Sequence, residues 1–311
     1  MARAIKKVAI IGTGVIGASW SALFLAKGLD VIATDVAPNA EASLRAFVAA
    51  AWPSLERLGL SPGASQGRLA FTSELDTAIA DCDLVQENGP ERIAFKRDLY
   101  KHLDEKLAAD VIIASSSSGL TMSEIQSACD LHPERCVIGH PFNPPHLVPL
   151  VEIVGGSKTS PATIERAMAF YNDLGKRAIH VRKEVPGHVA NRLAAALYRE
   201  VTYLVSEGVV DVGDVDAAVS WGPGLRWGIM GPNLLYHLGG GAGGIEHFFD
   251  QFTGPMTAWW KTLGTPEITS EVRDTIIKGV KAEVQSRSLP ELEAYRDEIL
   301  LGLLELRKSE R

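Results

Sequence analysis

The first 185 residues alternate short apolar runs with longer segments of helical periodicity. The short runs are rich in β-branched residues, which is typical of strands buried on both faces of a sheet. Strands are expected at residues 8–11, 31–34, 83–86, 111–114, 137–139 and 150–154, and helices at 15–27, 38–58 and 93–108. This alternation predicts an α/β fold with a doubly wound, mostly parallel sheet.

The pattern changes after Pro186-Gly187, and the rest of the chain shows helical periodicity almost throughout. Gly/Pro-rich loops interrupt it at residues 222–232 and 239–244, the second of which is expected to be a turn between helices. A chain of 311 residues is long enough for two domains. We therefore expect an α/β domain over residues 1–185, followed by an all-helical domain over residues 186–311.

Composition and charge exclude several classes of partner. The net charge is −7 and the basic residues are scattered, which argues against nucleic acid or an anionic membrane surface as the main partner. Cys82, Cys129 and Cys136 lack CxxC spacing, so we expect reduced, buried thiols and no metal site. No apolar run approaches about 18 residues and no signal peptide is evident, so a cytoplasmic location is expected.

A glycine-rich turn follows the first expected strand. Gly12-Thr13-Gly14-Val15-Ile16-Gly17 has the form GxGxxG and opens a helix, the context in which this motif binds a dinucleotide in a Rossmann-type domain. Gly12 would permit the tight turn, Gly14 would let the backbone approach the pyrophosphate, and Gly17 would allow close packing of helix on strand. The N–H groups at the helix N-terminus would then stabilise the phosphate charge.

An acid, Asp35, lies 18 residues beyond Gly17, at the end of the next expected strand. A carboxylate there accepts hydrogen bonds from the adenosine ribose and repels a 2′-phosphate, which favours NAD over NADP. Two alternatives remain open: a solvated carboxylate closing the strand, and an FAD-binding domain, which has the same glycines.

A second constellation surrounds the last strands of the α/β domain. His140 begins a proline-rich loop, and Glu152 lies within an apolar strand twelve residues later. Burying a carboxylate as an ion costs several kcal/mol unless it has a partner, and His140 is the obvious one. A carboxylate fixes the tautomer of the imidazole that it holds, as a general base requires. A purely structural pair is the alternative.

These motifs together resemble the 3-hydroxyacyl-CoA dehydrogenase family. His140-Pro141-Phe142-Asn143-Pro144-Pro145 and Pro149-Leu150-Val151-Glu152 look most like the branch that contains lambda-crystallin/L-gulonate 3-dehydrogenase and L-carnitine dehydrogenase. The resemblance covers nearly the whole chain. It implies an NAD-dependent oxidation of a 3-hydroxyl group, and a helical second domain that forms a homodimer.

The resemblance also implies roles for individual residues. His140 would be the general base and Glu152 would orient it, while Ser118 and Asn191 would hydrogen-bond the reacting oxygen. The remaining family matches, Glu91, Lys96 and Asn143, would contact NAD along with Val15 and Ile16 of the glycine turn. Lys96 has the alternative of an exposed helical lysine, and Asn143 has the alternative of a structural role. His146 is expected at the surface or beside the substrate.

Arg226 bears on the substrate because it lies in an otherwise apolar loop, where the acyl-CoA branch has no arginine. A guanidinium in such a setting needs an anion, and a carboxylate is the natural bidentate partner. The family's gulonate-type branch implies a free 3-hydroxycarboxylate, with a bridge to a structural carboxylate as the alternative. Aromatic residues in the second domain could hold a quaternary ammonium, with packing in the core or at a dimer interface as the alternative. The stretches Gly224-Leu225-Arg226-Trp227 and Trp259-Trp260-Lys261 resemble the carnitine type more than the gulonate type. A short-chain acyl-CoA thioester and a non-catalytic, crystallin-like role remain as alternatives.

Overall fold

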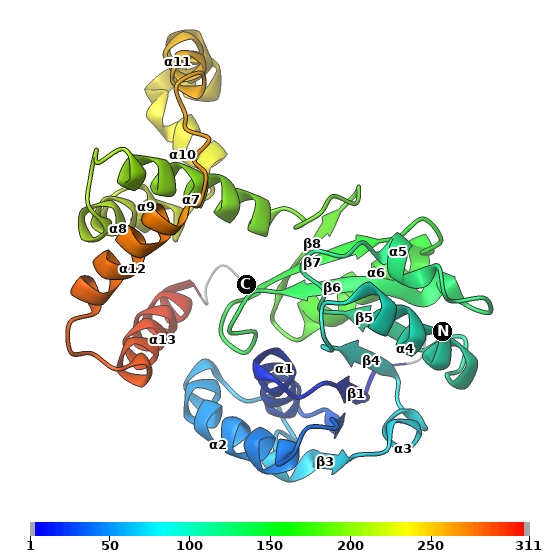
Figure 1. Ribbon diagram of the computed structural model, residues 1–311. Helices are drawn as coiled ribbons and strands as arrows, with labels where there is room; N and C mark the ends of the chain where they lie inside the picture. The colour runs from blue at the N-terminus through cyan, green and yellow to red at the C-terminus, as the bar shows by residue number, and fades with distance from the viewer. Residues whose placement is uncertain (1–3, 308–311) are drawn as a thin grey trace. The chain divides into compact units, whose positions relative to one another are not determined.

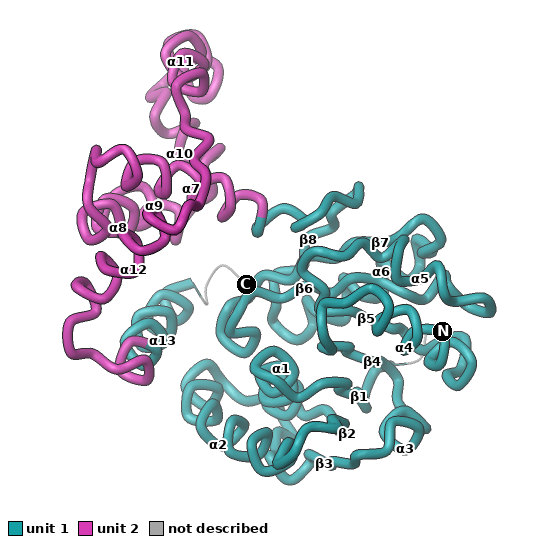
Figure 2. Tube along the Cα trace, in the orientation of Figure 1, with its two compact units in different colours: residues 1–191, 293–311 teal, residues 192–292 magenta. Residues whose placement is uncertain are grey.

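The computed structural model describes residues 4–307 (Figure 1). The chain divides into two units, coloured separately in Figure 2: residues 1–191 together with 293–311, and residues 192–292. The sequence pattern placed the division at residue 185, whereas in the structure the first residues of the following helix, and most of the last helix, group with the α/β unit. We call the two parts unit 1 and unit 2.

Unit 1 is built on one eight-stranded sheet with the order β3-β2-β1-β4-β5-β6-β7-β8. All neighbouring strands are parallel except β6 and β7, which are antiparallel. The mostly parallel sheet predicted from the sequence is therefore confirmed, with β3 and β8 added at its edges. The strands are β1 (Lys7–Ile11), β2 (Asp30–Thr34), β3 (Leu69–Thr72), β4 (Leu84–Glu87), β5 (Ile112–Ser115), β6 (Cys136–Pro141), β7 (Leu150–Gly155) and β8 (Arg177–Val181).

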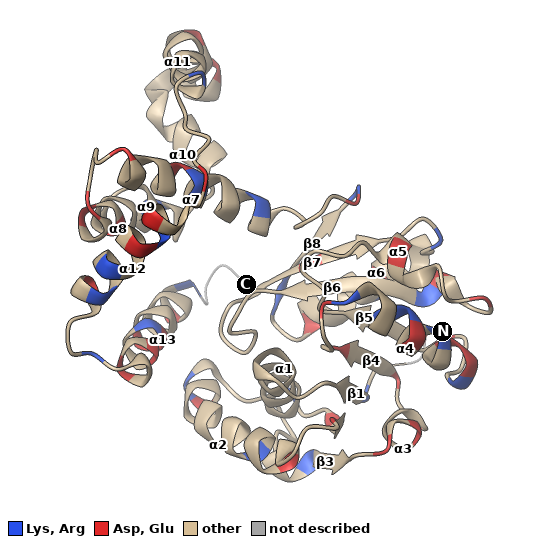
Figure 3. Ribbon diagram, in the orientation of Figure 1, with Lys and Arg blue, Asp and Glu red and all other residues tan. Residues whose placement is uncertain are grey.

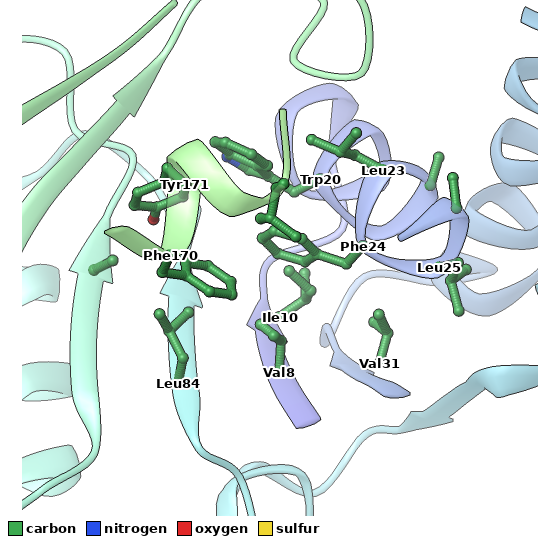
Figure 4. Packing of buried hydrophobic residues seen from close by; sticks show 14 of the residues in the cluster. Val8, Ile10, Trp20, Leu23, Phe24, Leu25, Val31, Leu84, Phe170 and Tyr171 are labelled. Carbon is green, nitrogen blue, oxygen red and sulfur yellow. The ribbon is translucent and has the colours of Figure 1, made fainter. Parts of the chain in front are cut away.

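Helices cover both faces of this sheet, because alternate residues of each strand point to opposite sides. Val8 and Ile10 of β1 pack with α1, α2 and α6, in the cluster around Trp20 and Phe24 shown in Figure 4. Ala9 and Ile11 pack with α3, α4 and α5 on the other face. The helices are α1 (Val15–Ala26), α2 (Ala40–Leu58), α3 (Leu75–Ile79), α4 (Ile93–Lys106), α5 (Met122–Gln126) and α6 (Pro161–Asp173), with 3₁₀ turns η1 (Gln66–Arg68) and η2 (Pro133–Arg135).

The last helix, α13 (Leu289–Leu306), returns to unit 1. Leu301 and Leu304 pack on Leu147 and Leu58, and Arg57 of α2 forms ion pairs with Glu298 and Glu305.

Unit 2 is helical, as the sequence pattern predicted. The expected loop at 222–232 differs from the structure, because Pro223 starts the short helix α9: proline fits a first helical turn, where its missing N–H is no loss. The glycine run 239–244 is a turn between helices, as expected. The helices are α7 (Ala190–Ser206), α8 (Val212–Trp221), α9 (Pro223–Trp227), α10 (Pro232–Gly239), η3 (Gly241–Gly243), α11 (Gly244–Trp260) and α12 (Ser270–Val284).

Charge is mixed in each unit: lysine and arginine as well as aspartate and glutamate occur in both (Figure 3). Among residues 4–307, no helix combines the length and the apolar character needed to cross a membrane.

The topology gathers several candidate residues of unit 1 at the carboxyl ends of the parallel strands. In a doubly wound sheet, ligands bind outside the carboxyl ends of the strands, where the strand order reverses. Here that point lies between β1 and β4, and the loops after β1, β4, β5 and β6 all begin at these carboxyl ends. These loops contain the glycine motif, Glu91, Ser118 and Asn143.

Candidate active site

The glycine turn has the geometry that its sequence predicts. Gly12 has φ +84°, and a Cβ there would lie 2.8 Å from the carbonyl oxygen of Asn88. A Cβ on Gly17 would lie 1.9 Å from the carbonyl oxygen of Gly12, so α1 could not pack this closely on the turn with any larger residue. Around Gly14 there is open space and no side chain caps the helix, which leaves the first N–H groups of α1 accessible to an anion.

Asp35 follows β2 and touches the glycine turn. Its Oδ2 accepts hydrogen bonds from the backbone N–H (2.7 Å) and the hydroxyl (3.0 Å) of Thr13, and its Oδ1 accepts from the N–H of Ala37. Burial alone would raise the pKa of Asp35, but these hydrogen bonds outweigh it and hold the pKa below its usual value. The group is therefore an anion at neutral pH, which is the form that disfavours a 2′-phosphate.

Glu91 fixes the loop that follows β5. Its Oε1 accepts hydrogen bonds from the hydroxyl of Ser117 (2.6 Å) and from the backbone N–H groups of Ser118, Gly119 and Leu120. Burial would raise the pKa of Glu91, yet these donors and the charge of Lys96 lower it. Whatever its part in binding a cofactor, Glu91 sets the position of the loop that carries Ser118.

Lys96 is fully buried on α4, so the alternative of an exposed helical lysine is wrong. Its ammonium group lies 2.9 Å from both carboxylate oxygens of Glu87 and 3.7 Å from Glu91. Glu87 also accepts a hydrogen bond from Ser115. The helical pattern hid this arrangement, because a lysine with a buried carboxylate partner belongs to the core despite its polar type.

His140 and Glu152 meet in the antiparallel pair β6–β7, where they are directly opposite in register. His140 Nδ1 lies 2.8 Å from Glu152 Oε2, and both side chains are buried. The pKa of Glu152 is lowered, since the hydrogen bonds from His140, Ala190 and Val189 outweigh the effect of burial. An ionised carboxylate only accepts, so Nδ1 carries the hydrogen and Nε2 of a neutral His140 keeps its lone pair.

The other oxygen of Glu152 holds the start of α7. Oε1 accepts hydrogen bonds from the backbone N–H groups of Val189 (2.9 Å) and Ala190 (3.0 Å). These donors lie at the N-terminus of α7, and the partial positive charge of a helix N-terminus stabilises a carboxylate. Asn191 is the next residue and is half-buried, so the same carboxylate that orients His140 also places Asn191.

The other predicted site residues differ in their exposure to solvent. Ser118 and Asn143 are exposed, in the loops after β5 and β6. His146 is buried, which contradicts the expected surface position: its Nδ1 lies 2.7 Å from the hydroxyl of Ser19 on α1. Arg226 is exposed on α9 of unit 2, and no hydrogen bond or ion pair of its guanidinium is found within residues 4–307.

Sequence reasoning missed Glu87, Asn88 and His188. Glu87 and Asn88 end a fully buried strand, and polar residues in that position are a signal that could have been read. Asn88 donates to the carbonyls of Ile11 and Gln86 and accepts from Ser116, which ties β1, β4 and β5 together. His188 carries no periodicity signal: it is buried in the turn before α7, with φ +50°.

Comparisons with known proteins identify the family of both domains. Residues 7–185 match the NAD binding domain of 3-hydroxyacyl-CoA dehydrogenase, and residues 187–269 match the C-terminal domain of the same family. The first match decides for NAD over FAD, the alternative that the glycine motif left open.

Individual relatives are similar over almost their full length. An L-carnitine dehydrogenase of Pseudomonas sp is 50% identical over 301 residues, covering 97% of this chain and 94% of the relative. One from Pseudomonas putida is 50% identical over 305 residues, covering 98% and 95%. The crystal structure of 5-formyl-3-hydroxy-2-methylpyridine 4-carboxylic acid 5-dehydrogenase, an NAD⁺-dependent dismutase, aligns with a TM-score of 0.84 and 32% identity over 97% of this chain and 98% of that one. The chain belongs to the 3-hydroxyacyl-CoA dehydrogenase family of NAD-dependent oxidoreductases.

Proposed function

We propose that this protein oxidises the 3-hydroxyl group of L-carnitine to a ketone, with NAD as the acceptor and His140 as the general base. The observation that carries the chemistry is the 2.8 Å contact between His140 Nδ1 and Glu152, which leaves Nε2 as the basic nitrogen. The similarity to L-carnitine dehydrogenases over nearly the whole chain supports the substrate.

The glycine turn fits NAD. The open space at Gly14, the uncapped N-terminus of α1 and the ionised Asp35 suit a pyrophosphate and a ribose without a 2′-phosphate. We assign Gly12, Gly14, Val15, Ile16 and Gly17 to this contact. Glu91, Lys96 and Asn143 are proposed to contact the nicotinamide half of NAD. Lys96 would do so while it keeps its ion pair with Glu87.

NAD, when bound, would supply the acceptor for the hydride that leaves C3 of the substrate. His140 Nε2 takes the proton of the hydroxyl group, and the carboxylate of Glu152 stabilises the imidazolium that forms. The Ser118 hydroxyl and the Asn191 amide donate hydrogen bonds to the reacting oxygen, where negative charge develops as the proton leaves. Arg226 is the proposed partner of the substrate carboxylate.

The proposal includes a homodimer in the cytoplasm. Most of the large apolar residues that are exposed in the described chain lie in unit 2, which suits a subunit interface there. All three cysteines are buried free thiols, and Cys129 and Cys136 lie with their sulfurs 3.8 Å apart, which suits a reducing compartment.

A substrate panel tests this function. Steady-state formation of NADH is measured with L-carnitine, L-gulonate, 3-hydroxybutyrate and 3-hydroxybutyryl-CoA, and kcat/KM is expected to be highest for L-carnitine. A preference for the thioester would make the protein an acyl-CoA dehydrogenase. Binding of NAD without turnover of any compound would favour a non-catalytic role.

The His140→Ala variant tests the general base in the same assay. Turnover should fall by about two to four orders of magnitude, because a positioned base contributes that much, while the Kd for NAD stays nearly unchanged. Equal activity of this variant and the wild type would eliminate the assignment.

A further inference from the structure

His188 is a buried histidine with no part in the mechanism above. It follows Gly187 and has φ +50°, in the left-handed region that costs a residue with a Cβ about 1 kcal/mol or more. Its backbone N–H bonds to the carbonyl of Val185 at 3.0 Å, and only 2% of the residue is exposed. A strained backbone persists only where surrounding contacts hold it, so the contacts of the side chain are informative.

The ring of His188 connects two parts of the proposed site. Its Nε2 lies 3.0 Å from the carbonyl oxygen of Ser117, the residue directly before Ser118. Its ring centroid is 5.2 Å from that of His140, with the planes inclined at 52°. The two residues that follow His188 donate their N–H groups to Glu152. One short segment thus contacts the serine loop, the imidazole and the carboxylate.

The hydrogen bond fixes the tautomer of His188. A carbonyl only accepts, so Nε2 carries the hydrogen, and Nδ1 is buried with no hydrogen-bond partner within residues 4–307. A proton on Nδ1 would be a buried donor without an acceptor, which is costly. Burial and the neighbouring His140 lower the pKa of His188, and they outweigh the Ser117 carbonyl and the carboxylates of Glu152 and Glu91. The ring is therefore neutral at neutral pH.

We propose that His188 is a positioning residue for the oxidation: as a neutral Nε2–H imidazole it holds the Ser117–Ser118 backbone in a fixed relation to the ring of His140. This inference rests on the proposed function. Ser118 is exposed within its loop, and two hydrogen bonds restrain the backbone around it. His188 donates to the carbonyl of Ser117, and Glu91 accepts from the N–H of Ser118. Neutrality matters as well, because a second positive charge 5.2 Å away would oppose formation of the imidazolium on His140.

Two substitutions separate the hydrogen bond from the bulk of the ring. His188→Phe keeps a ring but removes the donor, and kcat for L-carnitine should fall about tenfold to a hundredfold, since small misplacements of a catalytic group have effects of this size. KM and the Kd for NAD should change less than about threefold. His188→Gln restores a neutral N–H donor and should recover most of kcat. Equal kcat in the wild type and His188→Phe would overturn the proposal.

A double-mutant cycle distinguishes positioning from general support of the fold. If His188 acts through Ser118, the effects of His188→Phe and Ser118→Ala on kcat should be strongly non-additive. The matched control is His146→Phe, a buried histidine of the same unit, whose effect should add to that of Ser118→Ala. Additive effects for both histidines would assign His188 a merely structural role.

Nitrogen-15 NMR of histidine-labelled protein reads the same contact without turnover. The signals of His188, assigned by their loss in His188→Gln, should show a neutral Nε2–H ring at neutral pH. A charged ring or the Nδ1–H tautomer would overturn the inference even in an active enzyme. Absence of wild-type turnover on the whole panel, with the expected tautomer present, would instead count against the proposed function.

Discussion

Unit 1 contains two buried ion pairs, whereas Arg226 in unit 2 is exposed. Lys96 with Glu87, and Arg135 with Asp104, form ion pairs with side chains at most 3% exposed. Removing one partner of such a pair leaves an uncompensated buried charge and costs about 3–5 kcal/mol. The guanidinium of Arg226 forms no ion pair in the described part of the chain. Its replacement therefore tests substrate binding without breaking a buried ion pair.

Arg226→Ala should raise KM for L-carnitine by about a hundredfold, since a charge-assisted contact to a carboxylate contributes about 1.5–3 kcal/mol. Carnitine amide, which keeps the quaternary ammonium but lacks the carboxylate, should lose far less. Steady-state kinetics on both compounds measure the difference, and Arg226→Lys controls for charge without the guanidinium fork. If acid and amide suffer alike, Arg226 does not recognise the carboxylate.

His146 makes the stability of unit 1 sensitive to mild acid. Burial is the largest cause that lowers the pKa of His146 from 6.5 to about 4. The unfolded chain therefore binds a proton at this residue between pH 6.5 and 4, while the folded protein does not. Stability from this group is complete above pH 6.5 and falls by up to about 3 kcal/mol as the pH drops to 4.

His146→Asn should flatten the pH dependence of the free energy of unfolding between pH 6.5 and 4. The amide oxygen can accept the hydrogen bond of Ser19 in place of Nδ1, but it does not titrate. Urea unfolding across this range gives the slope. His180→Asn, at an exposed histidine of β8, is the matched control variant. A wild-type slope in His146→Asn would contradict the assignment.

At the level of elements, α13 is held to α2 and the proline-rich loop by two different kinds of contact. Arg57 pairs with Glu298 at 2.7 Å and Glu305 at 2.8 Å on the surface, whereas Leu304 is 7% exposed beside Leu147. Exposed ion pairs contribute about 0–1 kcal/mol each, and removing a buried leucine costs about 2–5 kcal/mol. The apolar contact should therefore dominate.

Leu304→Ala should lower the free energy of unfolding of unit 1 by about 2–3 kcal/mol, and Arg57→Ala should lower it by less. Denaturant titrations of the two variants provide the comparison. High salt should shrink only the effect of Arg57→Ala, because salt screens exposed charges. A larger loss in Arg57→Ala would show that the ion pairs hold the helix.

For the whole molecule, the exposed apolar surface of unit 2 predicts the oligomeric state. Trp259 is 67% exposed there, and Leu131 is 58% exposed in unit 1. A charge at a buried subunit contact is strongly unfavourable, so Trp259→Glu should weaken a dimer at least about tenfold. Sedimentation equilibrium measures the dissociation, with Leu131→Glu as the control. A monomeric wild type would contradict the proposed homodimer.

Much of the fold was predictable because its signals are local. The β-branched runs, the glycine turn and the change of pattern after residue 186 each depend on neighbours in the sequence. The strands β3 and β8 were missed because they lie at the edges of the sheet, where exposed positions dilute the apolar pattern. α9 was missed because its five residues include Pro223 and Gly224, and both residue types are common in loops.

The sequence by itself determined the inner strands of the sheet, the dinucleotide turn and the pairing of His140 with Glu152, since each has a fixed spacing or an apolar setting that demands a partner. Only the tertiary structure decided the environments of Lys96, His146 and His188. The physical reason is that a polar side chain is buried or exposed according to the partners that distant segments bring to it. Glu87, Ser19 and the carbonyl of Ser117 are those partners, and no local pattern predicts them.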